Sequence, residues 1–137
     1  MRDRDLNRIL YVEDDADIRK IVCMSLEMIG DYTVVACGSC ADALQVVDDF
    51  DPDLLLLDVM MPDVDGPSTL RKLRRRETAA NAPAVFITAK VQAGDMEHYG
   101  RLGVVDVIVK PFDPMTLSER IDHIWQRYRN DGHVHTG

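Results

Sequence analysis

The sequence lacks the features that would place a chain of 137 residues outside the ordinary globular proteins. No apolar run approaches the ~20 residues that a membrane-spanning helix needs. The charged start, MRDRDLNR, is followed by no apolar secretory segment. Cysteine is scarce, and an odd count of three (Cys23, Cys37 and Cys40) implies no disulfide framework. We therefore expect a cytoplasmic protein that does not contact membranes.

Positive charge is in deficit, with 16 lysine and arginine residues against 24 aspartate and glutamate residues and a formal net charge of −8. This balance argues against direct binding to nucleic acid. Glycine (8) and proline (6) are few, 46% of the residues are apolar and 29% are charged, which is typical of a globular domain. The length suits a single domain with a real hydrophobic core.

Short apolar runs alternate along the chain with segments whose apolar residues recur at helical spacing. The runs predict strands over residues 8–12, 32–37, 53–58, 84–88 and 106–110. The helical spacing predicts helices over residues 16–30, 40–50, 67–77, 92–103 and 114–129. Strands that are apolar throughout indicate a parallel sheet covered on both faces. We expect an α/β doubly wound domain over residues 1–129, with five strands and five helices, and a disordered tail over residues 130–137.

Polar side chains follow the predicted strands at their carboxyl ends. Glu13 and Asp14 follow the first strand, Asp58 ends the third, Thr88 the fourth and Lys110 the fifth. Because ligands of open parallel sheets bind beyond the carboxyl ends of the strands, we expect these side chains to share one site. The four leucines before Asp58 make that position unusual, since a carboxylate at the end of a buried strand is costly unless it is paired or has a function.

Residues of these types in one place favour metal-assisted phosphoryl chemistry. Crowded carboxylates repel one another unless a cation lies among them, and oxygen ligands indicate a hard cation such as Mg²⁺. Beside such a cation, Asp58 could act as a nucleophile and form an aspartyl phosphate. Thr88 could donate a hydrogen bond to one phosphoryl oxygen, and Lys110 could pair with another.

Four segments resemble, in order and spacing, the motifs of two-component response regulator receiver domains, the CheY-like family. They are ILYVEDDADIR, LLLLDVMMPDVDG, FITAK and VIVKPF. The resemblance covers residues 8–129 and implies a flavodoxin-like fold with strand order 2-1-3-4-5. It also implies a monomer or weak dimer. The expected activity is Mg²⁺-dependent self-phosphorylation and dephosphorylation only, so the chain is not expected to be an enzyme that turns over other substrates.

The resemblance implies that Asp58 accepts a phosphoryl group from a histidine kinase or histidine phosphotransfer protein. Phosphorylation would then switch the binding of a downstream effector, which the sequence does not name. Mg²⁺ would be bound directly by Asp14, Asp58 and the carbonyl of Met60, with Glu13 acting through water.

The resemblance also implies that Thr88 and Lys110 contact phosphoryl oxygens and that the Lys110–Pro111 peptide bond is cis. The chain departs from the family pattern at two positions. Glu13 stands where the family more often has Asp, and Val107 stands where it commonly has a Tyr or Phe that moves during switching.

Two other function classes stay open on the residues themselves. A haloacid-dehalogenase-type phosphatase also uses an Asp nucleophile after an apolar strand with Mg²⁺, but it needs a second Asp two residues on, where this chain has Met60. A thioredoxin-like oxidoreductase would use Cys37 and Cys40, a C-x-x-C pair between a predicted strand and helix.

Two features of the predicted helices have structural interpretations. The basic run RKLRRR (71–76) is expected in the last turns of the third helix, where the helix dipole favours cations, as a solvated face more than as a binding patch. Trp125 and Tyr128 are expected to pack the last helix onto the sheet.

Overall fold

The computed structural model describes residues 5–136, and side chains as far as Asp131. The strands are β1 (Arg8–Val12), β2 (Thr33–Cys37), β3 (Leu54–Asp58), β4 (Ala84–Thr88) and β5 (Val104–Val109). The helices are α1 (Ala16–Met28), α2 (Cys40–Phe50), α3 (Gly66–Leu73), the short 3-10 helix η1 (Glu77–Ala79), α4 (Asp95–Arg101) and α5 (Leu117–Thr136). All neighbouring strands pair in parallel, in the order β2-β1-β3-β4-β5. The predicted fold and strand order are confirmed.

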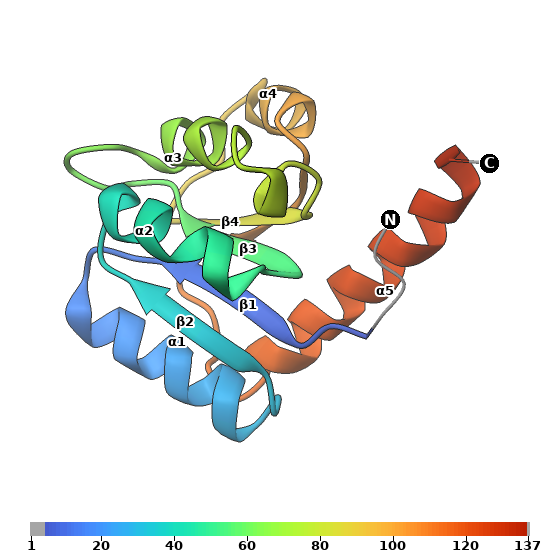
Figure 1. The fold of residues 1–137 in the computed structure, drawn as a ribbon. Coiled ribbons are helices and arrows are strands. Elements are labelled where there is room, and N and C mark those ends of the chain that lie inside the picture. The colour runs from blue at the N-terminus through green and yellow to red at the C-terminus, as the bar shows by residue number, and fades with distance from the viewer. Residues whose placement is uncertain (1–4, 137) are drawn as a thin grey trace.

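The sheet is the middle of three layers (Figure 1), with α1 and α5 on one face and α2, α3 and α4 on the other. Alternate residues of each strand point to opposite faces, so each strand supplies both cores. In β1, Leu10 and Val12 join the α2–α4 core, whereas Ile9 and Tyr11 join the α1–α5 core. The four leucines of β3 are completely buried, because β3 is central and covered on both sides.

Side-chain caps fix where three of the helices begin. Asp15, Ser39 and Asp65 each accept hydrogen bonds from backbone N–H groups in the first turn of α1, α2 and α3. These bonds satisfy donors that a helix start otherwise leaves free. Because each cap lies a few residues after the carboxyl end of a strand or in the loop that leads from it, the caps also fix the loops at that edge of the sheet.

The third helix is shorter than predicted, and its basic residues have different environments. The helix ends at Leu73, so the expectation that the whole basic run lies in its last turns is wrong. Arg74 is half-buried and donates to the backbone carbonyls of Ala79, Ala82, Leu102 and Gly103. Its guanidinium therefore joins the segment after α3 to the loop between α4 and β5, while Arg75 remains exposed.

The last two elements also differ in extent from their predictions. β5 starts at Val104, two residues early, because a register irregularity between Ala84 and Val85 lets Val105 bulge outward. α5 continues to Thr136, past the expected end at residue 129, because a single glycine weakens a helix without ending it. Trp125 is buried and its ring lies against that of Tyr128, as expected. None of the helices in residues 5–136 combines the length and the apolar character needed to span a bilayer.

Candidate functional site

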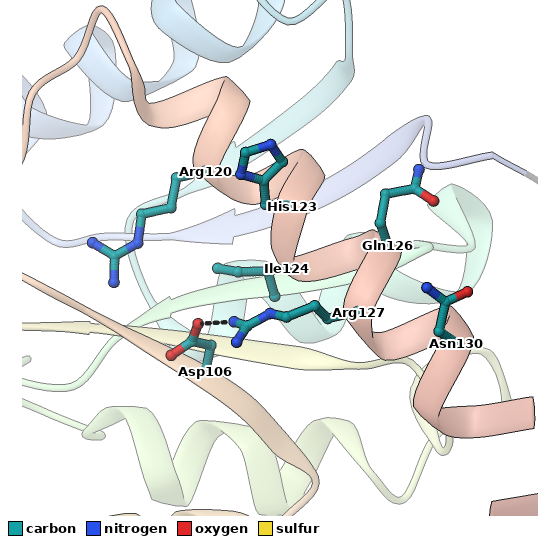
Figure 2. Close-up of a pocket in the computed structure, with 7 residues that line it drawn as sticks. All are labelled: Asp106, Arg120, His123, Ile124, Gln126, Arg127 and Asn130. Carbon is teal, nitrogen blue, oxygen red and sulfur yellow. Dashed lines mark hydrogen bonds and ion pairs between the residues drawn. The ribbon is translucent and has the colours of Figure 1, made fainter. Parts of the chain in front are cut away.

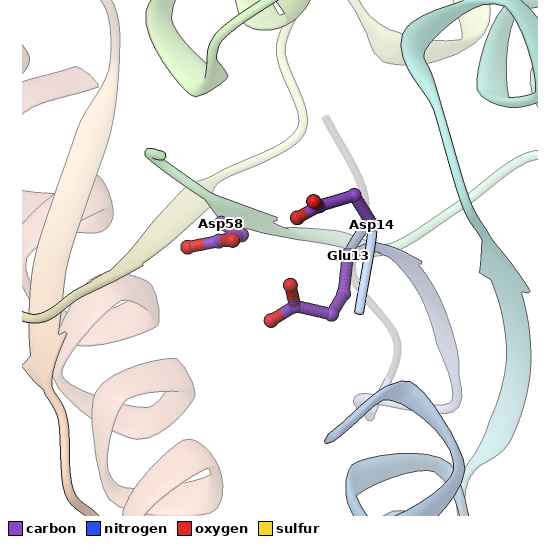
Figure 3. A group of neighbouring side chains, drawn as sticks. All are labelled: Glu13, Asp14 and Asp58. Carbon is purple, nitrogen blue, oxygen red and sulfur yellow. The ribbon is translucent and has the colours of Figure 1, made fainter. Parts of the chain in front are cut away.

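The carboxyl edge of the sheet brings together the polar residues that the sequence analysis selected. Glu13 and Asp14 follow β1, and Asp58 ends β3, the strand bonded directly to β1. One carboxylate oxygen from each of these three residues lies within 4.8 Å of the others. Figure 3 shows the three side chains reaching into the same space from the two neighbouring strands.

Asp58 is buried at this edge without a close hydrogen-bonding partner. The residue is 2% exposed, and its Oδ1 atom accepts no hydrogen bond in the structure. The ammonium of Lys110 is 3.4 Å from Oδ1 of Asp58 and also 3.4 Å from Oε1 of Glu13, which is long for a direct ion pair. Lys110 therefore offsets part of the negative charge without neutralising either carboxylate.

The electrostatics of the site follow from burial and crowding. Burial and the neighbouring Asp58 carboxylate raise the pKa of Glu13 to about 7, although Lys110 opposes the shift. Burial lowers the pKa of Lys110, but the carboxylates of Asp58 and Glu13 outweigh it, so this pKa lies above its ordinary value. The site therefore holds more negative charge than Lys110 alone balances, which is the condition that favours a bound cation.

Thr88, Lys110 and Met60, the other predicted site residues, differ in where their side chains point. The hydroxyl of Thr88 is buried and donates to the carbonyl of Lys90 at 3.1 Å, so it points along the next loop. The Lys110–Pro111 bond is cis, which confirms that expectation. The side chain of Met60 lies in solvent, 71% exposed, two residues after Asp58.

Backbone contacts hold the acidic loops in place. Arg19 of α1 donates to the carbonyl of Glu13 at 2.8 Å, and the amide of Asp15 donates to the Glu13 side chain at 3.2 Å. Gly66 packs directly on β3, where an added Cβ would come within 2.7 Å of the carbonyl oxygen of Asp58. Any larger residue at position 66 would displace the backbone that carries Asp58.

The donor set fits a hard divalent cation. The three groups within reach of one another are all carboxylates, and Mg²⁺ prefers oxygen ligands with retained waters. Oδ1 of Asp58 is buried and accepts no hydrogen bond, so it is an oxygen that a metal cation could bind. Among the described residues, Glu13, Asp14 and Asp58 are the set suited to hold the ion.

The raised pKa of Glu13 predicts how stability depends on pH in EDTA. The folded protein retains the Glu13 proton up to pH about 7, whereas an unfolded chain releases it near 4.5. The contribution of this group is therefore complete below pH 4.5 and is lost as the pH rises through 7. We expect the urea midpoint to fall across this window, and Glu13→Gln to remove that fall.

The same titration with saturating Mg²⁺ is the control, because a bound cation favours the ionised carboxylate. With Mg²⁺ bound, the urea midpoint should fall less as the pH rises. An identical fall in wild type and Glu13→Gln would assign the pH dependence to other groups.

Tyr11 is a site neighbour that the sequence analysis did not identify. The sequence pattern places it only in an apolar strand, yet its buried hydroxyl lies near Glu13 and Asp58. Burial raises the pKa of Tyr11, and the charges of these two carboxylates raise it further. Its position two residues before Glu13 is the signal that was available, because residues i and i+2 of a strand share a face.

The cysteine pair does not have the environment of a redox site. Cys37 and Cys40 are both 5% exposed, and both are free thiols. Burial raises the pKa of Cys37 to about 11, which disfavours the reactive thiolate.

Comparison with known families gives a match over most of the chain. Residues 9–122 match the response regulator receiver domain. The chain is 35% identical over 119 residues to the phosphate regulon transcriptional regulatory protein PhoB of Pseudomonas aeruginosa, covering 87% of this chain and 52% of PhoB. It is 37% identical over 123 residues to the probable transcriptional regulator ycf27 of Cyanophora paradoxa, covering 90% and 50%. The chain thus spans about half the length of these relatives.

Solved structures agree with this match. The N-terminal domain of a response regulator receiver protein from Methanoculleus marisnigri is 32% identical, with a TM-score of 0.70 over 87% of this chain and 96% of that chain. The chemotaxis protein CheY4 of Vibrio cholerae has a TM-score of 0.80 over 87% of this chain and 98% of its own; at 24% identity it supports the fold. With its parallel sheet, its acidic edge and this match over residues 9–122, the chain belongs to the response regulator receiver domain family, whose members act in phosphorelay signalling.

Proposed function

We propose that Asp58 is the phosphoacceptor of this receiver domain and that its modification switches the binding of a partner. The observation that carries the proposal is the state of its carboxylate, which is buried at the end of an entirely apolar strand, with Oδ1 accepting no hydrogen bond and only the Lys110 ammonium beside it at 3.4 Å. Such a group costs the fold stability, because a cation shared with Glu13 at this distance offsets only part of the cost of burying the charge. A reactive role accounts for its retention.

The proposed donor is a phosphohistidine of a histidine kinase or histidine phosphotransfer protein in the cytoplasm. An oxygen of Asp58 attacks the phosphorus, the phosphorus–nitrogen bond breaks with its electrons on the histidine, and an acyl phosphate forms. Lys110, already beside Asp58, pairs with one phosphoryl oxygen, and Thr88 donates to another. Mg²⁺ held by Glu13, Asp14, Asp58 and the Met60 carbonyl would supply charge neutralisation at the phosphoryl oxygens.

Direct phosphorylation tests this proposal. The protein is incubated with acetyl phosphate and Mg²⁺ and analysed by intact mass and peptide mapping. We expect one phosphoryl group, on Asp58, and no continuing release of phosphate from unrelated phosphoesters. Rapid multiple turnover of such esters would instead support the phosphatase alternative, and a phosphoryl group elsewhere would remove Asp58 from the proposal.

The exposed methionine beside the site predicts a long-lived phosphoryl group. The thioether of Met60 is only a weak hydrogen-bond acceptor, so it orients an attacking water poorly. We expect Met60→Asn to speed loss of the phosphoryl group by about tenfold, which corresponds to about 1.4 kcal/mol in the barrier. Decay of the radiolabelled protein measures this. Met28→Asn, at a 77% exposed position on α1, is the matched control, and equal rates for the two variants would refute the account.

The switch is proposed to pass through the loop after β4. Thr88 donates to the carbonyl of Lys90, so turning its hydroxyl toward a phosphoryl group breaks that bond and releases the loop. The loop leads into α4, a helix of seven residues with no side-chain cap at its start. Its buried Tyr99 meets the ring of Phe86 edge-on at 4.8 Å, which links α4 to β4.

β5 and α5 are joined by contacts that do not involve the residues proposed to bind the phosphoryl group. Figure 2 shows the polar side chains along α5 and the ion pair between Arg127 and Asp106, whose charged atoms are 2.7 Å apart. Arg120 donates to the carbonyl of Val107 at 3.1 Å. Val107 is also short and stiff about its first side-chain torsion, so it cannot swing as a Tyr or Phe would.

Amide hydrogen exchange with and without beryllofluoride and Mg²⁺ is expected to differ mainly over residues 89–102. β5 and the start of α5 should change little, for the reasons just given. Asp58→Asn treated with the same reagents is the control for effects of the reagents alone. Changes of equal size across Val107 and α5 would contradict this path.

The polar surface of α5 is relevant to the oligomeric state of the domain. The side chains that line its pocket with β5 are mainly charged or amide groups: Asp106, Arg120, His123, Gln126, Arg127 and Asn130, together with Ile124. Stable obligate interfaces are more apolar than this. A monomer or weak dimer is therefore the proposed state of the unphosphorylated domain.

A further inference from the structure

The hydroxyl of Tyr11 is a buried donor that makes no hydrogen bond of normal geometry, although the Glu13 side chain is close enough to raise its pKa. Tyr11 is 0% exposed, and among the described side chains only three buried polar atoms lack a hydrogen-bond partner. They are the Tyr11 hydroxyl, Oδ1 of Asp58 and Nε1 of Trp125. Two of the three belong to neighbouring residues at the acidic edge of the sheet.

Strand geometry directs this hydroxyl toward the carboxylates. Tyr11 shares a face of β1 with Glu13, two residues further along, and it pairs in register with Leu56 of β3. Leu56 precedes Asp58 by two residues, so all these side chains lie on the α1–α5 side of the sheet. The proximity is also electrostatic, because after burial the charges of Glu13 and Asp58 are the main causes that raise the pKa of Tyr11.

Packing does not explain why this residue is a tyrosine. Phenylalanine would fill the same volume between the sheet and α1 and α5 without placing a polar group in the core. An unpaired buried hydroxyl is unfavourable, so the group is explained by an acceptor that it serves in another state of the site.

Glu13 is the acceptor that most needs such a donor. Its side chain has one more rotatable bond than aspartate, and ordering it costs more conformational entropy. The two donors that it has are distant, with the Asp15 amide at 3.2 Å and the Lys110 ammonium at 3.4 Å. A phenol fixed in the core would hold the longer side chain in one position.

We propose that Tyr11 is a positioning residue of the metal site, whose hydroxyl donates a hydrogen bond to the Glu13 carboxylate when Mg²⁺ is bound. The inference rests on the proposed function, since it concerns the same site. Tyr11 neither touches the phosphoryl group nor binds the metal. It acts through Glu13, as outer partners of metal ligands do.

The test is Tyr11→Phe, with Mg²⁺ affinity measured by calorimetry and melting measured in EDTA. Loss of an outer partner typically weakens metal binding 10–100-fold, and we expect a dissociation constant roughly tenfold higher. Melting in EDTA should be unchanged or raised, because the unpaired donor has been removed. A residue that only packs would give the reverse, with lower melting and unchanged Mg²⁺ affinity, and that result would overturn the proposal.

Two further variants sharpen the test. Tyr32→Phe removes a hydroxyl from a second tyrosine, which is partly buried, and should leave Mg²⁺ affinity unchanged. In a Glu13→Asp background, Tyr11→Phe should lose its effect, because the shorter side chain does not reach the phenol. Strict additivity of the two substitutions would contradict the proposed pairing.

Failure of this inference can be told apart from failure of the proposed function. Wild type that is phosphorylated on Asp58, with Tyr11→Phe binding Mg²⁺ as wild type does, refutes the role of Tyr11 alone. Wild type that binds Mg²⁺ with the expected dependence on Tyr11, but is never phosphorylated on Asp58, refutes the phosphoacceptor proposal alone. Wild type that binds no Mg²⁺ overturns the role of Tyr11 whatever its phosphorylation.

Discussion

Replacing Asp58 with asparagine is expected to stabilise the metal-free protein by about 1–3 kcal/mol, because it removes a buried negative charge that repels Glu13. The substitution keeps the shape of the side chain and removes one of the charges that crowd Glu13. Urea unfolding in EDTA measures the difference. Asp14→Asn is the matched control, since Asp14 is exposed and should give a smaller gain.

When Mg²⁺ is added, the order of stability should reverse, so that wild type becomes more stable than Asp58→Asn. A ligand that binds only the folded state stabilises it, by about 2.7 kcal/mol at a concentration of 100 times its dissociation constant. Wild type should therefore gain stability in millimolar Mg²⁺, and Asp58→Asn should gain much less. If Mg²⁺ changes the melting of neither wild type nor Asp14→Ala, the metal site is wrongly placed.

Arg74→Ala is expected to destabilise the protein by about 3 kcal/mol or more, among the largest effects of any single change outside the apolar core. The substitution removes the donor for four backbone carbonyls, at Ala79, Ala82, Leu102 and Gly103. The carbonyls of the buried residues Ala79 and Ala82 lose a charged donor, whose hydrogen bonds are stronger than average, whereas the carbonyl of the exposed Gly103 keeps a bond from the Ala84 amide. Urea unfolding measures the loss.

Two variants separate this network from charge in general. Arg75→Ala removes the same charge from an exposed position and should change stability by no more than about 0.5 kcal/mol. Arg74→Lys keeps the charge but not the planar fork of five donors, so it should recover only part of the loss. Equal effects of Arg74→Ala and Arg75→Ala would show that the carbonyl network contributes little.

The sequence predicts an element of the fold correctly where a single pattern, such as a continuous apolar run, has only one structural interpretation. The fully buried run of β3 and the apolar runs of β1 and β4 have no competing interpretation. The proximity of Glu13, Asp14 and Asp58 could also be predicted from the sequence, because the carboxyl ends of parallel strands lie at one edge of the sheet.

Other features depend on contacts between distant segments, which a linear pattern does not contain. Arg74 and Arg75 are the same residue type side by side, and the carbonyls of the segments before β4 and before β5 make one a structural donor, whereas the other remains exposed. The early start of β5 likewise depends on its irregular register with β4. The hydroxyl of Tyr11 was overlooked because an aromatic residue in an apolar run is sufficiently explained by packing.

The place of α5 in the three layers has a consequence for synthesis on the ribosome. Chains emerge N-terminus first, and the strand order lets β1, β2 and β3 pair early while β4 and β5 are added one at a time at the growing edge. The face formed by Ile9, Leu56 and Ile87, however, needs Leu117, Ile121 and Trp125 from the last helix to cover it. A nascent chain halted before Leu117 can complete its sheet but exposes the part of this apolar face that α1 does not cover, which makes that intermediate prone to aggregation.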